Sequence, residues 1–162
     1  MTKFVSIDPS TNKTGLAYFE DGKLVEHLLL DLSAQKANPE QRFDNMAKEI
    51  LEYLSTHSPA IVWAEETWNA QNIQTTKTLS ELLGIIHGWC IANDIDFHKI
   101  LPSQWRKLCG IEQGKKKRAE LKQASMAYVL ERYGLTVNDD VADAIALGDG
   151  VINGYSAEEL FE

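Results

Sequence analysis

The segment KFVSIDPSTNKTGLAYF, residues 3–19, decides the fold of this chain. Two short apolar runs, residues 3–7 and 15–19, flank a turn in which proline, serine, threonine and asparagine follow one another, and this pattern predicts two strands. A third apolar run at residues 24–30 follows Asp21-Gly22, a pair that favours a tight hairpin turn. We therefore expect the chain to begin with an antiparallel meander of three strands.

Beyond this meander, helical patterns alternate with buried strands. A helix is expected from Asn38-Pro39 onward, because a capping side chain precedes proline and apolar residues then recur every three or four positions. Residues 60–64 and 95–100 predict two further strands with a helix between them, and the remainder from Pro102 is helical. Since helical crossovers join parallel strands, we predict an α/β fold with a mixed five-stranded sheet flanked by helices.

The composition is ordinary for a soluble globular protein. The 162 residues have a net charge of −8 and are 44% hydrophobic, and this length predicts one domain over residues 1–162. Cys90 and Cys109 are too few for a disulfide framework and favour a reducing compartment. No apolar run approaches the ~20 residues of a membrane span, and a strand pattern begins where a signal peptide would lie. We therefore expect a cytoplasmic protein without membrane contact.

Positive charge is concentrated in one part of this acidic chain. Between Arg106 and Lys122 there are seven basic and two acidic side chains. Such asymmetry within one domain predicts that a polyanion contacts a single face.

Four acidic side chains stand where the predicted fold would bring them together. Asp8 and Glu65 end two strands, and ligands of such sheets bind beyond strand ends where the strand order reverses. Asp140 and Asp143 share a helix face. Two carboxylates ~5 Å apart repel by roughly 3 kcal/mol at an effective dielectric of ~20, so we predict that Mg²⁺ or Mn²⁺ holds them together. Taken alone, each acid is better explained as a turn former, a solvated strand end or a helix cap.

Four motifs in chain order carry a resemblance to a known family. SIDPSTNKTG at residues 6–15 resembles the opening motif of RuvC-type Holliday junction resolvases, which belong to the ribonuclease H-like superfamily. AEETW at residues 64–68 resembles their second motif, and DVADA at residues 140–144 their closing acidic pair. PSQWRK at residues 102–107, with the lysines after it, is similar to phage-encoded branches of the family. The resemblance covers nearly the whole chain.

The resemblance implies a ribonuclease H-like fold and an endodeoxyribonuclease that nicks four-way DNA junctions as a homodimer. It implies two Mg²⁺ ions, for which Mn²⁺ can substitute, held by the acids Asp8, Glu65, Asp140 and Asp143. Glu65 rather than Glu66 is assigned because Trp68 follows it after three residues, and neighbouring strand residues point to opposite faces. A phage-encoded enzyme would act in the host bacterial cytoplasm, and either recombination or debranching of DNA remains open as its role.

The DNA-binding residues are expected in and near the basic segment. Lys115, Arg118 and Lys122 are spaced as one stripe of a helix, which predicts contacts with phosphates. Trp68 is equally compatible with stacking on an unpaired base and with a place in the core, whereas Trp105 is interpreted as a packing residue. The complete predicted set is Trp68, Arg106, Lys107, Lys115, Lys116, Lys117, Arg118 and Lys122.

Two other functions remain open at this stage. The chain could be a branched-DNA-binding module without catalysis, in which case junction binding would not depend on Mg²⁺ and no strand would be cut. A nucleotide-binding protein of the actin and sugar-kinase type is less compatible with the sequence, because those proteins need two such domains.

Overall fold

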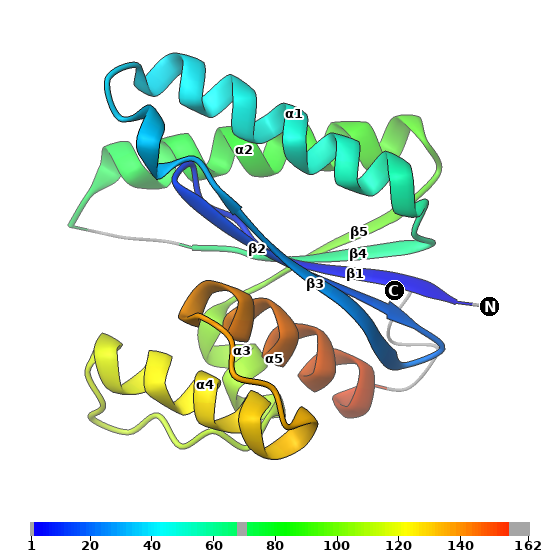
Figure 1. Cartoon of the computed structure of the whole chain (residues 1–162), viewed down its shortest axis with the longest axis vertical. Coiled ribbons are helices and arrows are strands. Elements are labelled where there is room, and N and C mark those ends of the chain that lie inside the picture. The colour runs from blue at the N-terminus through cyan, green and yellow to red at the C-terminus, as the bar shows by residue number, and fades with distance from the viewer. Residues whose placement is uncertain (1, 68–70, 156–162) are drawn as a thin grey trace.

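The computed structural model describes residues 2–67 and 71–155 and shows a five-stranded sheet between two layers of helices (Figure 1). The strands are β1 (Lys3–Asp8), β2 (Lys13–Glu20), β3 (Lys23–Asp31), β4 (Ile61–Glu65) and β5 (Asp96–Ile100). The helices are α1 (Pro39–His57), α2 (Ile73–Ala92), α3 (Pro102–Leu108), α4 (Arg118–Tyr133) and α5 (Asp139–Gly154), with a 3-10 turn η1 (Ser33–Gln35) before α1. In the described part of the chain, no helix is long and apolar enough to cross a membrane.

The strand order is β3-β2-β1-β4-β5. The first three strands are antiparallel, whereas β1, β4 and β5 are parallel, so the predicted meander and the predicted parallel strands are both confirmed. Strand β2 begins at Lys13 rather than at residue 15, because Lys13 already pairs with Asp31 of β3. The carboxyl ends of the adjacent strands β1 and β4 therefore lie side by side at one end of the sheet.

The pleat of β1 determines which helices each of its side chains contacts. Val5 and Ile7 belong to the core that α1 and α2 cover, while Phe4 belongs to the core under α5. Ser6 also faces α5, because its hydroxyl donates to the Ala144 carbonyl at 2.6 Å. Since side chains alternate along a strand, Asp8 lies on the same side as Ser6, toward α5.

Strand β4 follows the same rule. Ile61 and Trp63 pack in the core beside α5, and Val62 packs in the opposite core. Glu65 continues the series of Ile61 and Trp63 and therefore faces α5, as Asp8 does. Glu66 follows the end of the strand and is not among the residues that line the pocket described below. The strand thus presents Glu65, as predicted, rather than its neighbour.

Helix α5 lies very close to the sheet because glycine stands at two of their contact points, Gly15 on β2 and Gly148 on α5 itself. A Cβ on Gly15 would lie 2.6 Å from the carbonyl carbon of Asp140 and would also overlap its oxygen. On the helix itself, a Cβ on Gly148 would lie 2.6 Å from Ser6 Oγ. Real Cβ atoms do not approach other atoms so closely, so these positions accept no larger residue without movement. The first turn of α5 is therefore fixed over the end of β1.

Candidate active site

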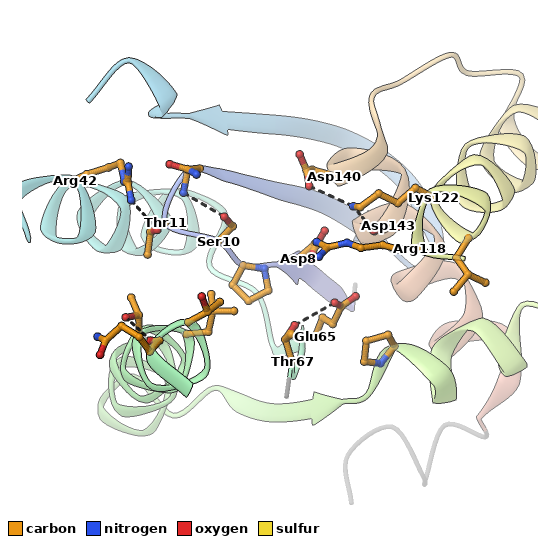
Figure 2. A pocket seen from close by; sticks show the side chains of 18 of the residues that line it. Asp8, Ser10, Thr11, Arg42, Glu65, Thr67, Arg118, Lys122, Asp140 and Asp143 are labelled. Atoms are coloured by element: carbon orange, nitrogen blue, oxygen red, sulfur yellow. Dashed lines mark hydrogen bonds and ion pairs between the residues drawn. The ribbon is translucent and has the colours of Figure 1, made fainter. Parts of the chain in front are cut away.

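The four predicted acids line one pocket of about 760 Å³ at the carboxyl ends of β1 and β4 (Figure 2). Asp8 and Glu65 come from these strands, and Asp140 and Asp143 come from the first turns of α5. The prediction that folding brings these four side chains together is confirmed by their shared pocket.

Glu65 is held by hydrogen bonds to both of its carboxylate oxygens. The indole Nε1 of Trp105 donates to Oε2 at 2.9 Å, and the Thr67 hydroxyl donates to Oε1 at 3.3 Å. Burial raises the pKa of Glu65 to about 6, the charge of Asp143 adds to the rise, and the hydrogen bond from Trp105 opposes it. Trp105 is fully buried, as expected of a packing residue, but it also orients an acid. The sequence gives no signal for this second role, because the two residues meet only through the fold.

Helix α5 begins so that its two acids point into the pocket. The Asn138 side chain caps the helix by accepting from the Val141 N–H at 3.0 Å. Asp143, one turn after Asp140, is buried, and its Oδ1 atom has no hydrogen-bond partner among the described residues. Burial raises the pKa of Asp143, although the nearby charge of Lys122 opposes the rise. A buried acceptor without a partner is a site at which a cation would be favourable.

Lys122 lies among these acids rather than on an outward face of its helix. Its Nζ atom is 3.4 Å from Asp139 Oδ2, 3.4 Å from Asp143 Oδ2 and 3.8 Å from Asp140 Oδ1 (Figure 2). Its side chain is 22% exposed. Helical spacing groups Lys122 with Arg118, but it does not say which way the helix faces. The ammonium group therefore serves as the counter-ion of the acidic cluster in this conformation.

Helix α4, which carries Lys122, is fixed against α5 by the buried carboxylate of Asp149. Tyr128 and Tyr133 both donate their hydroxyls to this carboxylate, the second at 2.5 Å. The Arg132 guanidinium lies 3.2 Å from Asp149 Oδ2. These three residues lie on two successive turns of α4, and their contacts with Asp149 of α5 determine how α4 meets the pocket.

Asp8 lies in an unfavourable electrostatic position for a carboxylate. Burial raises its pKa well above the usual range, and the charges of Glu65 and Asp143 raise it further. Lys122 acts in the opposite direction. The carboxylates therefore repel one another, and one ammonium group relieves that repulsion only in part.

The donor set fits a divalent cation, but its present geometry does not form a metal site. In residues 2–67 and 71–155, no group of three or more histidine, cysteine, aspartate or glutamate side chains is arranged to hold a metal ion. Lys122 instead supplies positive charge beside two of the four acids, Asp140 and Asp143, and beside the neighbouring Asp139. All available donors are carboxylate oxygens, which suit Mg²⁺ or Mn²⁺, and the unpartnered Asp143 Oδ1 is one of them.

The raised carboxyl pKa values predict that metal-free protein is more stable in mild acid. A group whose pKa is higher in the folded state binds its proton more tightly there, so the unfolding free energy falls as pH rises. For Glu65, a rise from 4.5 to about 6 corresponds to about 2 kcal/mol, present at low pH and lost as pH rises through 6. Thermal unfolding in EDTA between pH 4.5 and 7.5 measures this effect.

The Glu65→Gln variant should unfold with a weaker pH dependence over this range, and Glu66→Gln should behave like wild type. An equal pH dependence in wild type and Glu65→Gln would contradict the assignment of the effect to this site.

Two of the predicted DNA-binding residues besides Lys122 line the pocket. Arg106 of α3 and Arg118 at the start of α4 reach it, and Arg106 also lies over the Trp105 ring at 5.1 Å. Lys107 is exposed on α3 and does not line the pocket. Trp68 lies outside the described residues.

The interpretation of Lys115 as part of the α4 stripe is wrong. The helix begins at Arg118, with Lys117 as an extended N-cap residue, and the chain turns at Gly114, whose φ is +43°. Lys115, Lys116 and Lys117 are instead three exposed residues of the segment that leads into the helix. Three consecutive lysines do not disfavour a helix by propensity, so the spacing alone could not place its first residue.

Comparison with known proteins gives a consistent result. Residues 4–149 match the family described as "Crossover junction endodeoxyribonuclease RuvC". A protein of that name from Caldicellulosiruptor saccharolyticus is 25% identical over 150 residues, which cover 90% of this chain and 89% of the relative.

Solved structures show the same fold. The T. thermophilus RuvC in complex with Holliday junction substrate superposes with a TM-score of 0.72 at 18% identity, covering 93% of this chain and 92% of the other. The Fowlpox virus resolvase, solved with substrate Holliday junction DNA, gives a TM-score of 0.65 at 16% identity and covers 99% of this chain and 100% of the other. These likenesses confirm the predicted ribonuclease H-like fold.

Proposed function

The chain belongs to the RuvC family of crossover junction endodeoxyribonucleases, and we propose that it nicks four-way DNA junctions by hydrolysing phosphodiester bonds in the pocket of Asp8. The observation that carries this proposal is the convergence of four carboxylates from β1, β4 and α5 on one pocket. Basic side chains of α3 and α4 border the same pocket and supply the charge that DNA requires. Family membership implies a divalent-metal nuclease.

Two Mg²⁺ ions, with Mn²⁺ as a substitute, would be held by Asp8, Glu65, Asp140 and Asp143. When bound, such ions activate water for attack on the phosphodiester and stabilise the leaving oxygen. Trp105 and Thr67 orient the Glu65 carboxylate through their hydrogen bonds. The ammonium group of Lys122 must leave the acids before cations enter, and it is then free to contact a phosphate.

This arrangement predicts opposite effects of Lys122→Met on two measurements. The metal-free protein should lose up to about 1 kcal/mol of stability, because the acids lose their internal counter-ion. Mg²⁺ should bind about tenfold more tightly, because no ammonium group has to be displaced. Thermal unfolding in EDTA measures the first effect, and titration calorimetry with Mg²⁺ measures the second.

Lys107→Met is the matched control, because it removes the same charge from an exposed position outside the pocket. A Mg²⁺ affinity of Lys122→Met no higher than that of the Lys107→Met variant would exclude competition between Lys122 and the metal.

The exposed lysines before α4 predict a change in the salt dependence of DNA binding. The double variant Lys115→Ala/Lys117→Ala should bind a four-way junction more weakly, and the slope of log affinity against log salt should fall by about two. Fluorescence anisotropy at several salt concentrations measures this slope. The control Lys3→Ala/Lys23→Ala removes two charges from the end of the sheet that lies away from Asp8, where both lysines pair with Glu20. It should leave the slope unchanged. Equal slopes for both variants would show that residues 115–117 do not contact the DNA.

We also propose that the chain acts as one nuclease domain and as a homodimer. A four-way junction has two strands to cut, and a two-fold symmetric dimer would present one pocket to each. Sedimentation of the protein alone and with a junction tests this assembly.

A gel assay with four-way, three-way, flap and duplex substrates tests the proposed function. We expect the protein to nick four-way junctions only when Mg²⁺ or Mn²⁺ is present, and to cut duplex DNA little. Tight junction binding without any cut in either metal would instead favour a DNA-binding module.

A further inference from the structure

The pocket has a second end, away from the carboxylates, at which α1 meets the loop after β1. Figure 2 shows Arg42 and Thr11 there, with Ser10 between them and Asp8. The side chains that line this end carry hydroxyl, amide and guanidinium groups. The only carboxylates among the described lining residues are the four at the other end.

The Arg42 guanidinium has hydrogen-bonding capacity that the protein leaves unused. Its Nη2 atom donates to Thr11 Oγ1 at 3.4 Å, a long contact. Its Nε atom is buried and has no hydrogen-bond partner among the described residues. No carboxylate of the described chain lies within 4.0 Å of this guanidinium, although buried or half-buried arginines normally pair with an anion. An anion in the pocket would supply the missing acceptor.

The two neighbouring hydroxyls are also arranged as donors. Ser10 Oγ accepts from the Asn12 N–H at 3.1 Å and from the Lys13 N–H at 3.5 Å, while Thr11 Oγ1 accepts from Arg42. Each hydroxyl has one proton, and within the described residues neither donates it. Ser10, Thr11 and Arg42 therefore offer donors and no negative charge, which is the chemistry that binds a phosphate.

This end of the pocket lies within one or a few nucleotides of the acids. Thr11 is three residues from Asp8, so their Cα atoms are at most about 11 Å apart. Phosphates of one DNA strand follow one another at about 3.4 Å of helix rise. A DNA strand whose phosphodiester lies beside Asp8 would therefore place a neighbouring backbone phosphate next to Thr11 and Arg42.

We infer that Ser10, Thr11 and Arg42 form a second phosphate subsite, which holds a backbone phosphate of the junction next to the one that is cut. The inference rests on the proposed function, because it assumes that DNA enters this pocket. The positive subsite would also offset the repulsion between the DNA backbone and the acidic end, and would fix the register of the strand over Asp8.

Junction binding by wild type, Arg42→Gln, Arg42→Lys and Thr11→Val tests the subsite. Fluorescence anisotropy in EDTA, over a range of salt, gives the dissociation constant and its salt slope. Arg42→Gln should bind about tenfold more weakly or worse, with a slope smaller by about one. Arg42→Lys should keep the slope but recover only part of the affinity, and Thr11→Val should bind a few-fold more weakly.

Lys48→Gln is the control, because it removes the same charge from an exposed position of the same helix. An Arg42→Gln variant with the affinity and slope of Lys48→Gln would overturn the subsite. A wild-type protein that binds junctions no better than duplex would overturn the proposed function instead, so the two failures are distinguishable.

Neutral methylphosphonates, placed one at a time beside the cleaved bond, identify the phosphate itself. At one position the methylphosphonate should weaken junction binding by the wild-type protein about tenfold. It should leave junction binding by Arg42→Gln unchanged, because that variant has already lost the charge pair. If every position weakens both proteins equally, Arg42 holds no DNA phosphate. If inorganic phosphate stabilises wild type but not Arg42→Gln while no methylphosphonate discriminates, the site binds free anions only and the DNA subsite is wrong.

Discussion

Asparagine in place of Asp8 is expected to abolish junction cleavage while leaving junction binding at the wild-type level. The substitution keeps the shape of the side chain but removes one of the charges that would hold the cations, so the cleavage rate should fall by roughly 10³-fold. The metal-free protein should at the same time become more stable, because a carboxylate that burial and the charge of Glu65 both disfavour is gone. Single-turnover cleavage with Mg²⁺, junction binding in EDTA and thermal unfolding in EDTA measure the three effects.

Asp44→Asn is the control, because Asp44 is an exposed acid on α1 outside the pocket. Its cleavage, binding and stability should equal those of wild type. Cleavage by Asp8→Asn at the wild-type rate would exclude Asp8 from the metal site. A fall in the stability of the metal-free Asp8→Asn protein would contradict the electrostatic account of the cluster.

Gly15→Ala is expected to have the largest effect on stability. The added Cβ would overlap the backbone carbonyl of Asp140, and backbone atoms, unlike the end of a flexible side chain, cannot turn aside. We expect a loss of about 3 kcal/mol and a melting temperature lower by about 6–12 °C. Because α5 must shift to admit the methyl group, Asp140 and Asp143 would leave the pocket and cleavage would fall steeply even below the melting temperature.

Gly84→Ala is the matched control. A Cβ at this exposed position of α2 would meet no atom within 4 Å, so alanine should stabilise the helix by up to about 1 kcal/mol. A Gly15→Ala protein with the wild-type melting temperature would show that α5 does not depend on this close approach.

The acids of the pocket could be predicted from sequence because local rules place each of them. Asp8 and Glu65 end buried strands, and alternation along the strand selects Glu65 over Glu66. Asp140 and Asp143 follow a helix cap and share a face. What the sequence could not supply was the set of contacts around them, namely that Trp105 donates to Glu65 and that Lys122 lies beside Asp140 and Asp143.

The basic residues show the limit of the same reasoning. Periodicity grouped Arg118 with Lys122 but did not reveal that α4 turns both toward the pocket, since that depends on how Asp149 fixes α4 to α5. Lys115 was misplaced because no strong capping residue marks the start of the helix. Arg42 gave no signal at all, because an arginine in the first turns of an amphipathic helix normally faces solvent.

The hydrogen bond from Trp105 to Glu65 gives the protein a built-in optical reporter. The emission of an indole depends on the charge that its N–H group faces, and here that charge belongs to an acid of the pocket. Protonation of Glu65 near pH 6, or its neutralisation by a bound ion, would change the fluorescence of Trp105 without any attached dye. Occupancy of the pocket could therefore be followed in real time during a single turnover, with Trp105→Phe as the spectroscopic blank.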